Sequence, residues 1–148
     1  MSLTKVNVSL TSGNIFNSIF DSAEYWCGVG GSYRPDAQGI GYRDFSINDT
    51  RAEYIMSKHP KSVLDIGCGG GFIVKRLRER GVDAWGIDIS QYCVDHYAPE
   101  SIKPFLVVKN CIELPFEDGR FDWAFTMGVL EHLSPSDVEL ACAEITRV

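Results

Sequence analysis

Two aspartates and a run of glycines are the residues of this 148-residue sequence whose types and spacing point most directly to chemistry. Asp65 lies in the stretch VLDIGCGGG, just before the glycines of positions 67–71, and Asp88 follows at the end of the next apolar stretch. Glycine lets a backbone turn tightly and lets a ligand approach it closely. An acid placed like Asp88 accepts hydrogen bonds from ribose hydroxyls in nucleotide-binding folds. The pattern therefore predicts a site for a ribose-containing small molecule.

The residues around this loop separate two kinds of ribose-containing ligand. A dinucleotide loop of the form G-x-G-x-x-G needs a third glycine at position 72, where this sequence has Phe72. The carboxylate of Asp65 is unfavourable beside a pyrophosphate and favourable beside an ammonium or sulfonium group. A ligand with adenine, ribose and a cationic amino-acid end suits both acids, and S-adenosyl-L-methionine is such a ligand. An NAD(P)-dependent oxidoreductase is the alternative, and its loop would have to accept Phe72 and Asp65.

Alternating strands and helices are expected to position this loop. The predicted strands are short apolar runs, at 62–66, 82–87, 104–109 and 121–127. The predicted helices have apolar residues at helical spacing, at 70–81, 91–98 and 134–148. Ser90 and Ser134 are placed to cap two of these helices, and Val138, Cys142 and Ile145 are expected to form the buried stripe of the last one. This order predicts an α/β fold with a doubly wound, Rossmann-like parallel sheet over residues 61–148.

Residues 1–60 differ in composition and are expected to form helices joined by a glycine-rich loop. Helical spacing is found in NIFNSIFDSAEYW and again in NDTRAEYIMSK, the second with Asn48 or Asp49 as its cap. Between them, CGVGGSYRPDAQGIGYRD has the composition of a mobile loop. Aromatic residues and an arginine at its two ends either close over the site as a lid or are ordinary core and surface residues. They are Tyr25, Trp26, Tyr42 and Arg43.

The overall composition narrows the class of protein. A net charge of -6 argues against a phosphate-neutralising surface, so no nucleic-acid partner is expected. The five cysteines are odd in number and lack a C-x-x-C pair, which favours reduced thiols over a disulfide framework and predicts no metal site. No membrane-spanning apolar run and no secretory signal are found, so a cytoplasmic protein without a membrane partner is expected.

Three motifs of this sequence resemble, in order and spacing, those of the class I S-adenosylmethionine-dependent methyltransferases. They are VLDIGCGGG, GIDIS and NCIELPFEDGRFDWAFTMGVLEHL, and the resemblance covers residues 61–148. It implies a Rossmann-like core, transfer of a methyl group to a small-molecule substrate, and S-adenosyl-L-methionine as the cofactor. A non-catalytic fragment that binds S-adenosylmethionine is a further alternative.

The first two motifs of this resemblance imply contacts with the methionine and ribose parts of the cofactor. The residues implied around the methionine part are Asp65, Gly67, Cys68 and Gly69. Asp88 would accept hydrogen bonds from both ribose hydroxyls, and Ile89 would lie against the adenine. The alternative for Asp65 is that it only caps the helix that follows the loop.

The third motif implies contacts with adenine and departs from the family at one position. Family members often have an aspartate where this sequence has Asn110, whose amide oxygen would accept from the adenine amino group without a negative charge. The backbone N–H of Cys111 would serve the adenine ring, and Met127 would flank the cofactor. Cys68 is expected to be a small packing residue, and core packing is also expected for the side chains of Cys111 and Cys142.

A catalytic base is the least determined part of this site. Methyl transfer from a sulfonium is an in-line displacement in which alignment and exclusion of water supply much of the catalysis. A base is needed only where the acceptor must lose a proton. His132, which follows the fourth predicted strand near the expected acceptor entrance, is the candidate. The alternative is that Glu131 and His132 only lie on the approach to a helix.

The number of predicted strands falls short of the family fold. The resembling family has a seven-stranded sheet, in which the first strand lies between the second and the fourth, whereas this sequence supplies four strands before Val148. The fourth strand would then be an edge, with unpaired backbone groups beside Trp123 and Phe125. We therefore expect either a fragment of a longer methyltransferase or a homo-oligomer in which a second copy covers this edge.

Overall fold

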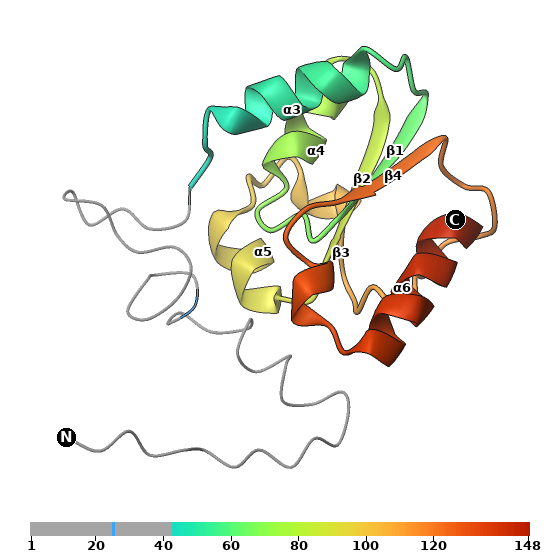
Figure 1. The fold of residues 1–148 in the computed structure, drawn as a ribbon. Coiled ribbons are helices and arrows are strands. Elements are labelled where there is room, and N and C mark those ends of the chain that lie inside the picture. The colour runs from blue at the N-terminus through green and yellow to red at the C-terminus, as the bar shows by residue number, and fades with distance from the viewer. Residues whose placement is uncertain (1–24, 26–42) are drawn as a thin grey trace, which may run out of the picture.

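The computed structural model describes Tyr25 and residues 43–148, whose arrangement is shown in Figure 1. The elements in chain order are helix α3 (Ile47–Met56), strand β1 (Ser62–Ile66), α4 (Phe72–Glu79), β2 (Asp83–Asp88), α5 (Gln91–Tyr97), the 3-10 helix η1 (Lys103–Phe105), β3 (Leu106–Val108), β4 (Trp123–Thr126), the 3-10 helix η2 (Leu130–His132) and α6 (Pro135–Arg147). Strands therefore alternate with helices from β1 to β3, and β4 follows β3 without a helix between them, as the sequence predicts.

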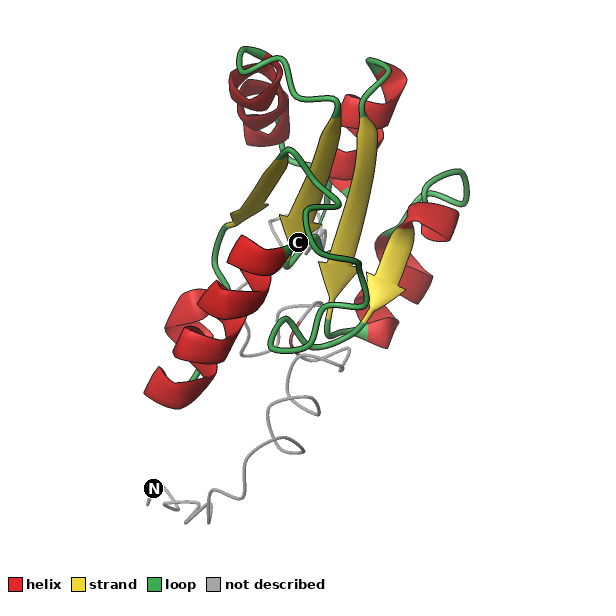
Figure 2. Ribbon diagram, turned by 90° about the vertical axis from the view of Figure 1, so that its right-hand side faces the viewer, coloured by secondary structure: helices red, strands yellow, loops and turns green. Residues whose placement is uncertain are grey.

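The four strands form one parallel sheet in the order β3-β2-β1-β4, and Figure 2 shows all four arrows pointing the same way. β1 lies inside the sheet, where Asp65 is in register with Gly86 of β2 and Phe125 of β4. The strand order reverses beside β1, and ligands of such sheets bind beyond the carboxyl ends of the strands at that reversal. The predicted α/β, doubly wound fold class and the order of these four strands are confirmed.

Helices cover both faces of the sheet, each over its own apolar core. On one face Ala52 of α3 and residues of α4 pack with Val63 of β1. On the other face Ala141 of α6 packs with Leu64 of β1, and Figure 1 shows α6 on the opposite side of the sheet from α3 and α4. Because successive side chains of a strand point to opposite faces, Asp65 shares the α3 and α4 face with Val63.

Two of the predicted helix caps are confirmed. The Oγ atom of Ser90 accepts a hydrogen bond from the N–H of Cys93 at 2.9 Å at the start of α5. The Oγ atom of Ser134 accepts from the N–H of Asp137 at 3.2 Å at the start of α6, which has a proline in its first turn. These bonds satisfy backbone donors that have no partner inside the helix.

The predicted cap of α3 is wrong. The helix begins at Ile47, so Asn48 and Asp49 lie in its first turn, and the residue at the cap position, Ser46, makes no side-chain cap hydrogen bond. Asp49 instead accepts a hydrogen bond from Nε of Arg76 on α4 at 2.6 Å. The polar residues at the start of α3 therefore serve helix-to-helix packing, and a sequence pattern does not distinguish that use from capping.

Two smaller predictions also differ from the structure. β3 has three residues because Pro104 and Phe105 belong to η1. On α6, Cys142 is exposed, whereas Ala141 is fully buried and Ile145 packs against the same core. The buried stripe is therefore turned by one residue, and the prediction of a core position for Cys142 is wrong.

The outer edge of β4 pairs with no strand in the part of the chain that the structure describes. The side chains of Trp123 and Phe125 are half-buried and pack against the α3 and α4 core, so they are less exposed than an open edge suggests. Cover by a second copy or by a further segment stays a prediction. None of the helices in the described residues has the length and apolar character needed to cross a membrane.

Candidate functional site

The loop between β1 and α4 takes its shape from its glycines. Gly67, Gly69 and Gly71 have φ angles of 80°, 53° and 70°, a region that residues with a side chain rarely adopt. A Cβ atom on Gly67 would also lie 2.1 Å from Cγ2 of Val129, in the segment after β4. The backbone of this loop thus lies against the segment that follows β4, with no room for a side chain between them.

The first residues of this loop are fixed to β2. The N–H groups of Gly67 and Cys68 both donate to the carbonyl oxygen of Ile87, at 2.8 and 3.0 Å. A Cβ atom on Gly86 would lie 2.7 Å from Sγ of Cys68, so the thiol occupies space that the glycine leaves open. Burial raises the pKa of the Cys68 thiol, which keeps it protonated and unreactive. The prediction that Cys68 is a packing residue is confirmed.

Asp65 is a buried acid without a hydrogen-bond donor among the described residues. Its exposed fraction is 4%. Burial raises the pKa of Asp65 to about 8, the negative charge of Asp88 adds to this rise, and the positive charge of Arg51 opposes it. No hydrogen bond within the described residues joins the carboxylate to α4, so the structure does not support the alternative that Asp65 only caps this helix.

A hollow of about 250 Å³ lies beside Asp65, where β1 and β4 end. Its walls include Gly67 of the loop, Met127 after β4 and Arg51 of α3. Pockets for drug-sized molecules measure roughly 300–1,000 Å³, so this hollow suits one end of such a ligand. The ionisable acidic and basic side chains of its described lining are the carboxyl group of Asp65 and the guanidinium groups of Arg43 and Arg51.

Arg51 is a candidate binding residue that our sequence analysis does not single out. It is half-buried on α3, and its Nη1 atom donates to Oδ1 of Asn48 at 3.3 Å. The guanidinium group of Arg51 and the carboxyl group of Asp65 line the same hollow. Once a bound cation ionises Asp65, the two side chains complement a zwitterion such as the amino-acid end of a ligand. The signal in the sequence is weak, because it amounts to one arginine next to the buried Ala52 in a helix that mixes apolar and polar residues.

Asp88 differs from Asp65 because it already holds two backbone groups. Its Oδ2 atom accepts from the N–H of Gly69 at 2.7 Å, and its Oδ1 atom accepts from the N–H of Ser90 at 2.9 Å. These bonds tie the glycine loop to the start of α5.

The residues predicted to contact adenine lie beside Asp88 at the carboxyl end of the sheet. The N–H of Lys109 donates to the carbonyl oxygen of Asp88 at 2.9 Å, which places the end of β3 next to the end of β2. Oδ1 of Asn110 accepts from the backbone N–H two residues later at 3.1 Å. Cys111 is buried in the α6 core, as predicted for its side chain, and Ile89 is half-buried. Their adenine contacts stay predictions.

Met127 and His132 lie at the two ends of the segment that follows β4. Met127 is 40% exposed and lines the hollow. His132 is exposed at the end of η2 and is not part of the hollow's described lining. The structure therefore brings Met127, but not His132, together with Asp65.

The predicted lid falls largely outside the described residues. Trp26 and Tyr42 lie outside the described residues, and so do the first predicted helix, except for Tyr25, and most of the glycine-rich loop. Tyr25 is half-buried, and Arg43 lines the hollow. Within the residues that are described, no group of three or more histidine, cysteine or acidic side chains is arranged to hold a metal ion.

Comparison with known proteins identifies a family over more than half of the chain. Residues 64–148 match a family described as "Methyltransferase domain". A ubiquinone biosynthesis O-methyltransferase of Nitrosococcus oceani is 26% identical over an alignment of 162 residues. The alignment covers 99% of this chain and 61% of that protein. The enzyme of the same name from Bordetella avium is 31% identical over 112 residues, or 69% of this chain and 46% of that protein. The chain thus spans about half the length of these relatives.

Solved structures share this fold. Magnesium protoporphyrin IX methyltransferase from Synechocystis PCC 6803, with bound S-adenosylmethionine, superposes with a TM-score of 0.63 at 18% identity, covering 95% of this chain and 73% of that one. The PH0226 protein from Pyrococcus horikoshii OT3 gives a TM-score of 0.59 at 27% identity, covering 71% of this chain and 51% of that one.

The matched domain and the glycine loop with its two acids show that this protein belongs to the class I S-adenosylmethionine-dependent methyltransferases.

Proposed function

We propose that this chain is the cofactor-binding part of a methyltransferase that methylates an oxygen atom of a small molecule. The observation that supports this most strongly is that the carboxyl group of Asp65 and the guanidinium group of Arg51 line one hollow beside the glycine loop. The names of the curated relatives support oxygen as the acceptor atom. A small acceptor is in keeping with the acidic net charge of -6.

The residues present fit S-adenosyl-L-methionine. Asp65, which has no hydrogen-bond donor among the described residues, would receive the ammonium group of its methionine part. Arg51 would receive the carboxylate, and the absence of side chains at Gly67 and Gly69 would let the ligand approach the loop backbone closely. Asp88 would accept from the ribose hydroxyls. When bound, this cofactor supplies a methyl group on a sulfonium, so the chain itself needs no nucleophile.

Titration of the chain with S-adenosylmethionine, S-adenosylhomocysteine and NAD tests the cofactor. Because burial raises the pKa of Asp65 to about 8, most chains carry it neutral at pH 7. A cation bound beside it favours the ionised form. Binding of S-adenosylhomocysteine should therefore release close to one proton at pH 7, seen as a calorimetric heat that depends on the buffer. Asp65→Asn should abolish that release.

The results of this titration separate the alternatives. Binding of NAD without either sulfur-containing ligand would contradict the proposal and favour an oxidoreductase. Binding of S-adenosylmethionine without turnover on a panel of small acceptors would favour a non-catalytic fragment.

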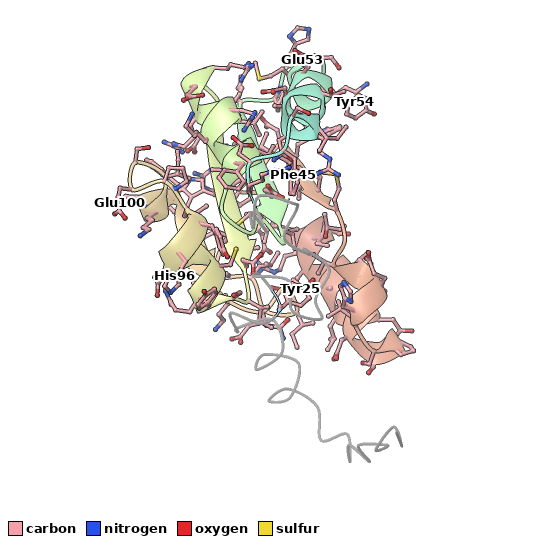
Figure 3. All side chains as sticks on the ribbon, turned by 90° about the vertical axis from the view of Figure 1, so that its left-hand side faces the viewer. Tyr25, Phe45, Glu53, Tyr54, His96 and Glu100 are labelled. Atoms are coloured by element: carbon pink, nitrogen blue, oxygen red, sulfur yellow. The ribbon has the colours of Figure 1, made fainter. Side chains whose placement is uncertain are left out.

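His132 is our proposed base for acceptors that must lose a proton. It lies five residues after Met127, which lines the hollow, and acceptor binding near Met127 would bring the reacting atom toward η2. His132→Ala should lower turnover roughly 10²–10⁴-fold and leave cofactor affinity near wild type. His96 on α5, which Figure 3 shows well apart from Phe45 at the start of α3, provides the matched control. Equal losses of turnover and cofactor affinity would assign His132 a structural role instead.

A further inference from the structure

One wall of the hollow is a single short segment, residues 43–51, which leads into α3 and includes its first turn. The lining residues that this segment supplies are Arg43, Phe45, Ile47, Asn48 and Arg51. The rest of the described lining comes from β1, the glycine loop, the start of α4 and the residue after β4. The position of Arg51 in the hollow therefore depends on how this segment is held beside α4.

Arg76 of α4 holds this segment at two points. Its Nη1 atom lies 2.8 Å from Oδ2 of Asp44, and its Nε atom lies 2.6 Å from Oδ1 of Asp49 in the first turn of α3. Nη1 also donates to the carbonyl oxygen of Phe72 at 3.0 Å, at the start of α4. The side chain of Arg76 is 13% exposed and is not part of the hollow's described lining. Arg76 thus lies behind the wall and joins it to α4.

A chain of hydrogen bonds leads from Arg76 to Arg51. Asp44 is bonded to Arg76 through Oδ2 and accepts through Oδ1 from Nδ2 of Asn48 at 3.2 Å. Oδ1 of Asn48 accepts from Nη1 of Arg51 at 3.3 Å. Asn48 is buried, and turning its amide over would set donor against donor at Arg51 and acceptor against acceptor at Asp44. The guanidinium group of Arg51 is therefore held in one orientation before a ligand arrives.

We propose that Arg76 is a positioning residue that acts through Asp44 and Asn48 to hold Arg51 ready for the carboxylate of the cofactor. This inference rests on the proposed function and adds to it a residue outside the hollow that determines the affinity for the amino-acid end. An arginine side chain has several rotatable bonds. One that is already held in its binding orientation loses less conformational freedom when the ligand binds.

Two ligands that differ at one end test this inference without requiring turnover. S-adenosylhomocysteine and 5′-methylthioadenosine share adenine, ribose and a thioether sulfur, but the second lacks the amino-acid end. Calorimetric titration gives the dissociation constant of each. We expect Arg51→Ala to weaken binding of S-adenosylhomocysteine at least about tenfold, and Arg76→Ala at least about threefold. Both variants should bind 5′-methylthioadenosine within about twofold of wild type, whereas a general loss of structure would weaken both ligands.

The double variant Arg51→Ala/Arg76→Ala shows whether Arg76 acts through Arg51. When Arg51 is absent, a positioning residue has nothing left to hold, so Arg76→Ala should then change the affinity for S-adenosylhomocysteine by less than about twofold. Arg78→Ala is the matched control. Arg78 is half-buried on the same helix and also bonds an acid and a backbone carbonyl, those of Asp83 and Ala84, at the amino end of β2. Arg78→Ala should change the affinity for neither ligand.

The ionisation of Asp65 gives a second measurement, which needs no ligand. Burial and Asp88 raise the pKa of Asp65, and the charge of Arg51 opposes this rise. Arg51→Ala should therefore raise the pKa further, and Arg76→Ala should raise it by a smaller amount, as followed by NMR of the carboxyl carbon. Arg43 on the same hollow is unchanged in these variants. In the Arg51→Ala background Arg76→Ala should leave the pKa unchanged, which separates an effect through Arg51 from a direct effect of the Arg76 charge.

Several results would overturn the inference. They are an unchanged affinity for S-adenosylhomocysteine in Arg76→Ala, an equal weakening of both ligands, and an effect of Arg76→Ala that is as large without Arg51 as with it. If Arg76→Ala does not fold, Arg76→Lys and Asp44→Asn are judged by the same criteria. Failure of wild type to bind S-adenosylhomocysteine would instead refute the proposed function, and the pKa of Asp65 would then decide whether Arg76 positions Arg51.

Discussion

Asp65 and Asp88 are the same residue type near the ends of neighbouring parallel strands, yet their surroundings differ. Asp88 accepts hydrogen bonds from the N–H groups of Gly69 and Ser90. Asp65 has no donor among the described residues, and burial raises its pKa to about 8. Asp88 therefore stabilises the chain around it, whereas burial disfavours the ionised form of Asp65 until a cation binds beside it.

The helices that follow these two strands repeat the difference. α5 begins after Ser90, whose side chain caps it, whereas α4 begins after Gly71, a left-handed residue with no side-chain cap hydrogen bond. The loop after β1 also bonds its own backbone, since the N–H groups of Gly67, Cys68 and Gly69 all donate within the chain. The polar group without a donor among the described residues is there the carboxyl group of Asp65. Comparison of the two strand ends teaches that a binding site is marked by incomplete internal bonding as much as by residue type.

The largest expected effect concerns pH and Asp65. Its pKa is raised in the folded chain from 3.8 to about 8, so between these values the unfolded chain loses a proton that the folded chain keeps. Stability should therefore fall as the pH rises from about 4 to about 8, with an upper limit of about 6 kcal/mol at about 1.4 kcal/mol per pKa unit. Urea unfolding of the cofactor-free chain at several pH values measures this.

Asp65→Asn is the variant that isolates this effect. It cannot ionise, so its stability should exceed that of wild type at pH 8 and approach it near pH 4. If the stabilities of wild type and Asp65→Asn changed with pH in parallel, ionisation of Asp65 would not destabilise the folded chain. The contrast with Asp88 would then disappear.

Gly67→Ala should have the next largest effect, because it changes the loop between the two acids. Position 67 combines a φ of 80° with a Cβ position 2.1 Å from Val129, so we expect a loss of about 3 kcal/mol or more in the free energy of unfolding. Gly81→Ala is the matched control, with a φ of 84° and open space around it, and should cost about 1–2 kcal/mol. Equal losses would mean that the Val129 contact is unimportant.

Asp88→Ala should weaken binding of S-adenosylhomocysteine by about 1.5–3 kcal/mol, the range for hydrogen bonds to a charged group. It should also lower the free energy of unfolding, because the N–H groups of Gly69 and Ser90 lose their acceptor. Asp122→Ala is the control, since Asp122 accepts from two backbone N–H groups at the start of β1, at 2.7 and 3.1 Å, far from the loop. Asp122→Ala should change stability only, and unchanged affinity in Asp88→Ala would remove Asp88 from the site.

The smallest expected effect is on the helix cap after β2. Ser90→Ala removes the acceptor for the N–H of Cys93 and should lower the free energy of unfolding by about 1 kcal/mol. The backbone N–H that Ser90 donates to Asp88 remains, so the affinity for S-adenosylhomocysteine should stay near wild type. A large loss of affinity would show that the ligand site also depends on the capped start of α5.

The sequence predicts the local features of this molecule better than its contacts between segments. The residues of β1 and the caps at Ser90 and Ser134 follow from apolar runs and from side chains that bond their own backbone. The place of Arg51 beside Asp65 depends on how α3 lies over the sheet, which no local pattern contains. The error at Cys142 has the same origin, because one residue of rotation about the axis of α6 is decided by packing.

The fit between Gly86 and Cys68 makes these two positions epistatic. A Cβ atom at position 86 would lie within 2.8 Å of Sγ and Cβ of Cys68, and also of a methyl group of Leu106. Gly86→Ala alone should therefore disturb the loop, and a second change of Cys68→Gly would relieve two of these three clashes. The residue allowed inside a cofactor loop is thus partly dictated by a neighbouring strand that belongs to a different motif, so substitutions at the two positions have to be designed as a pair.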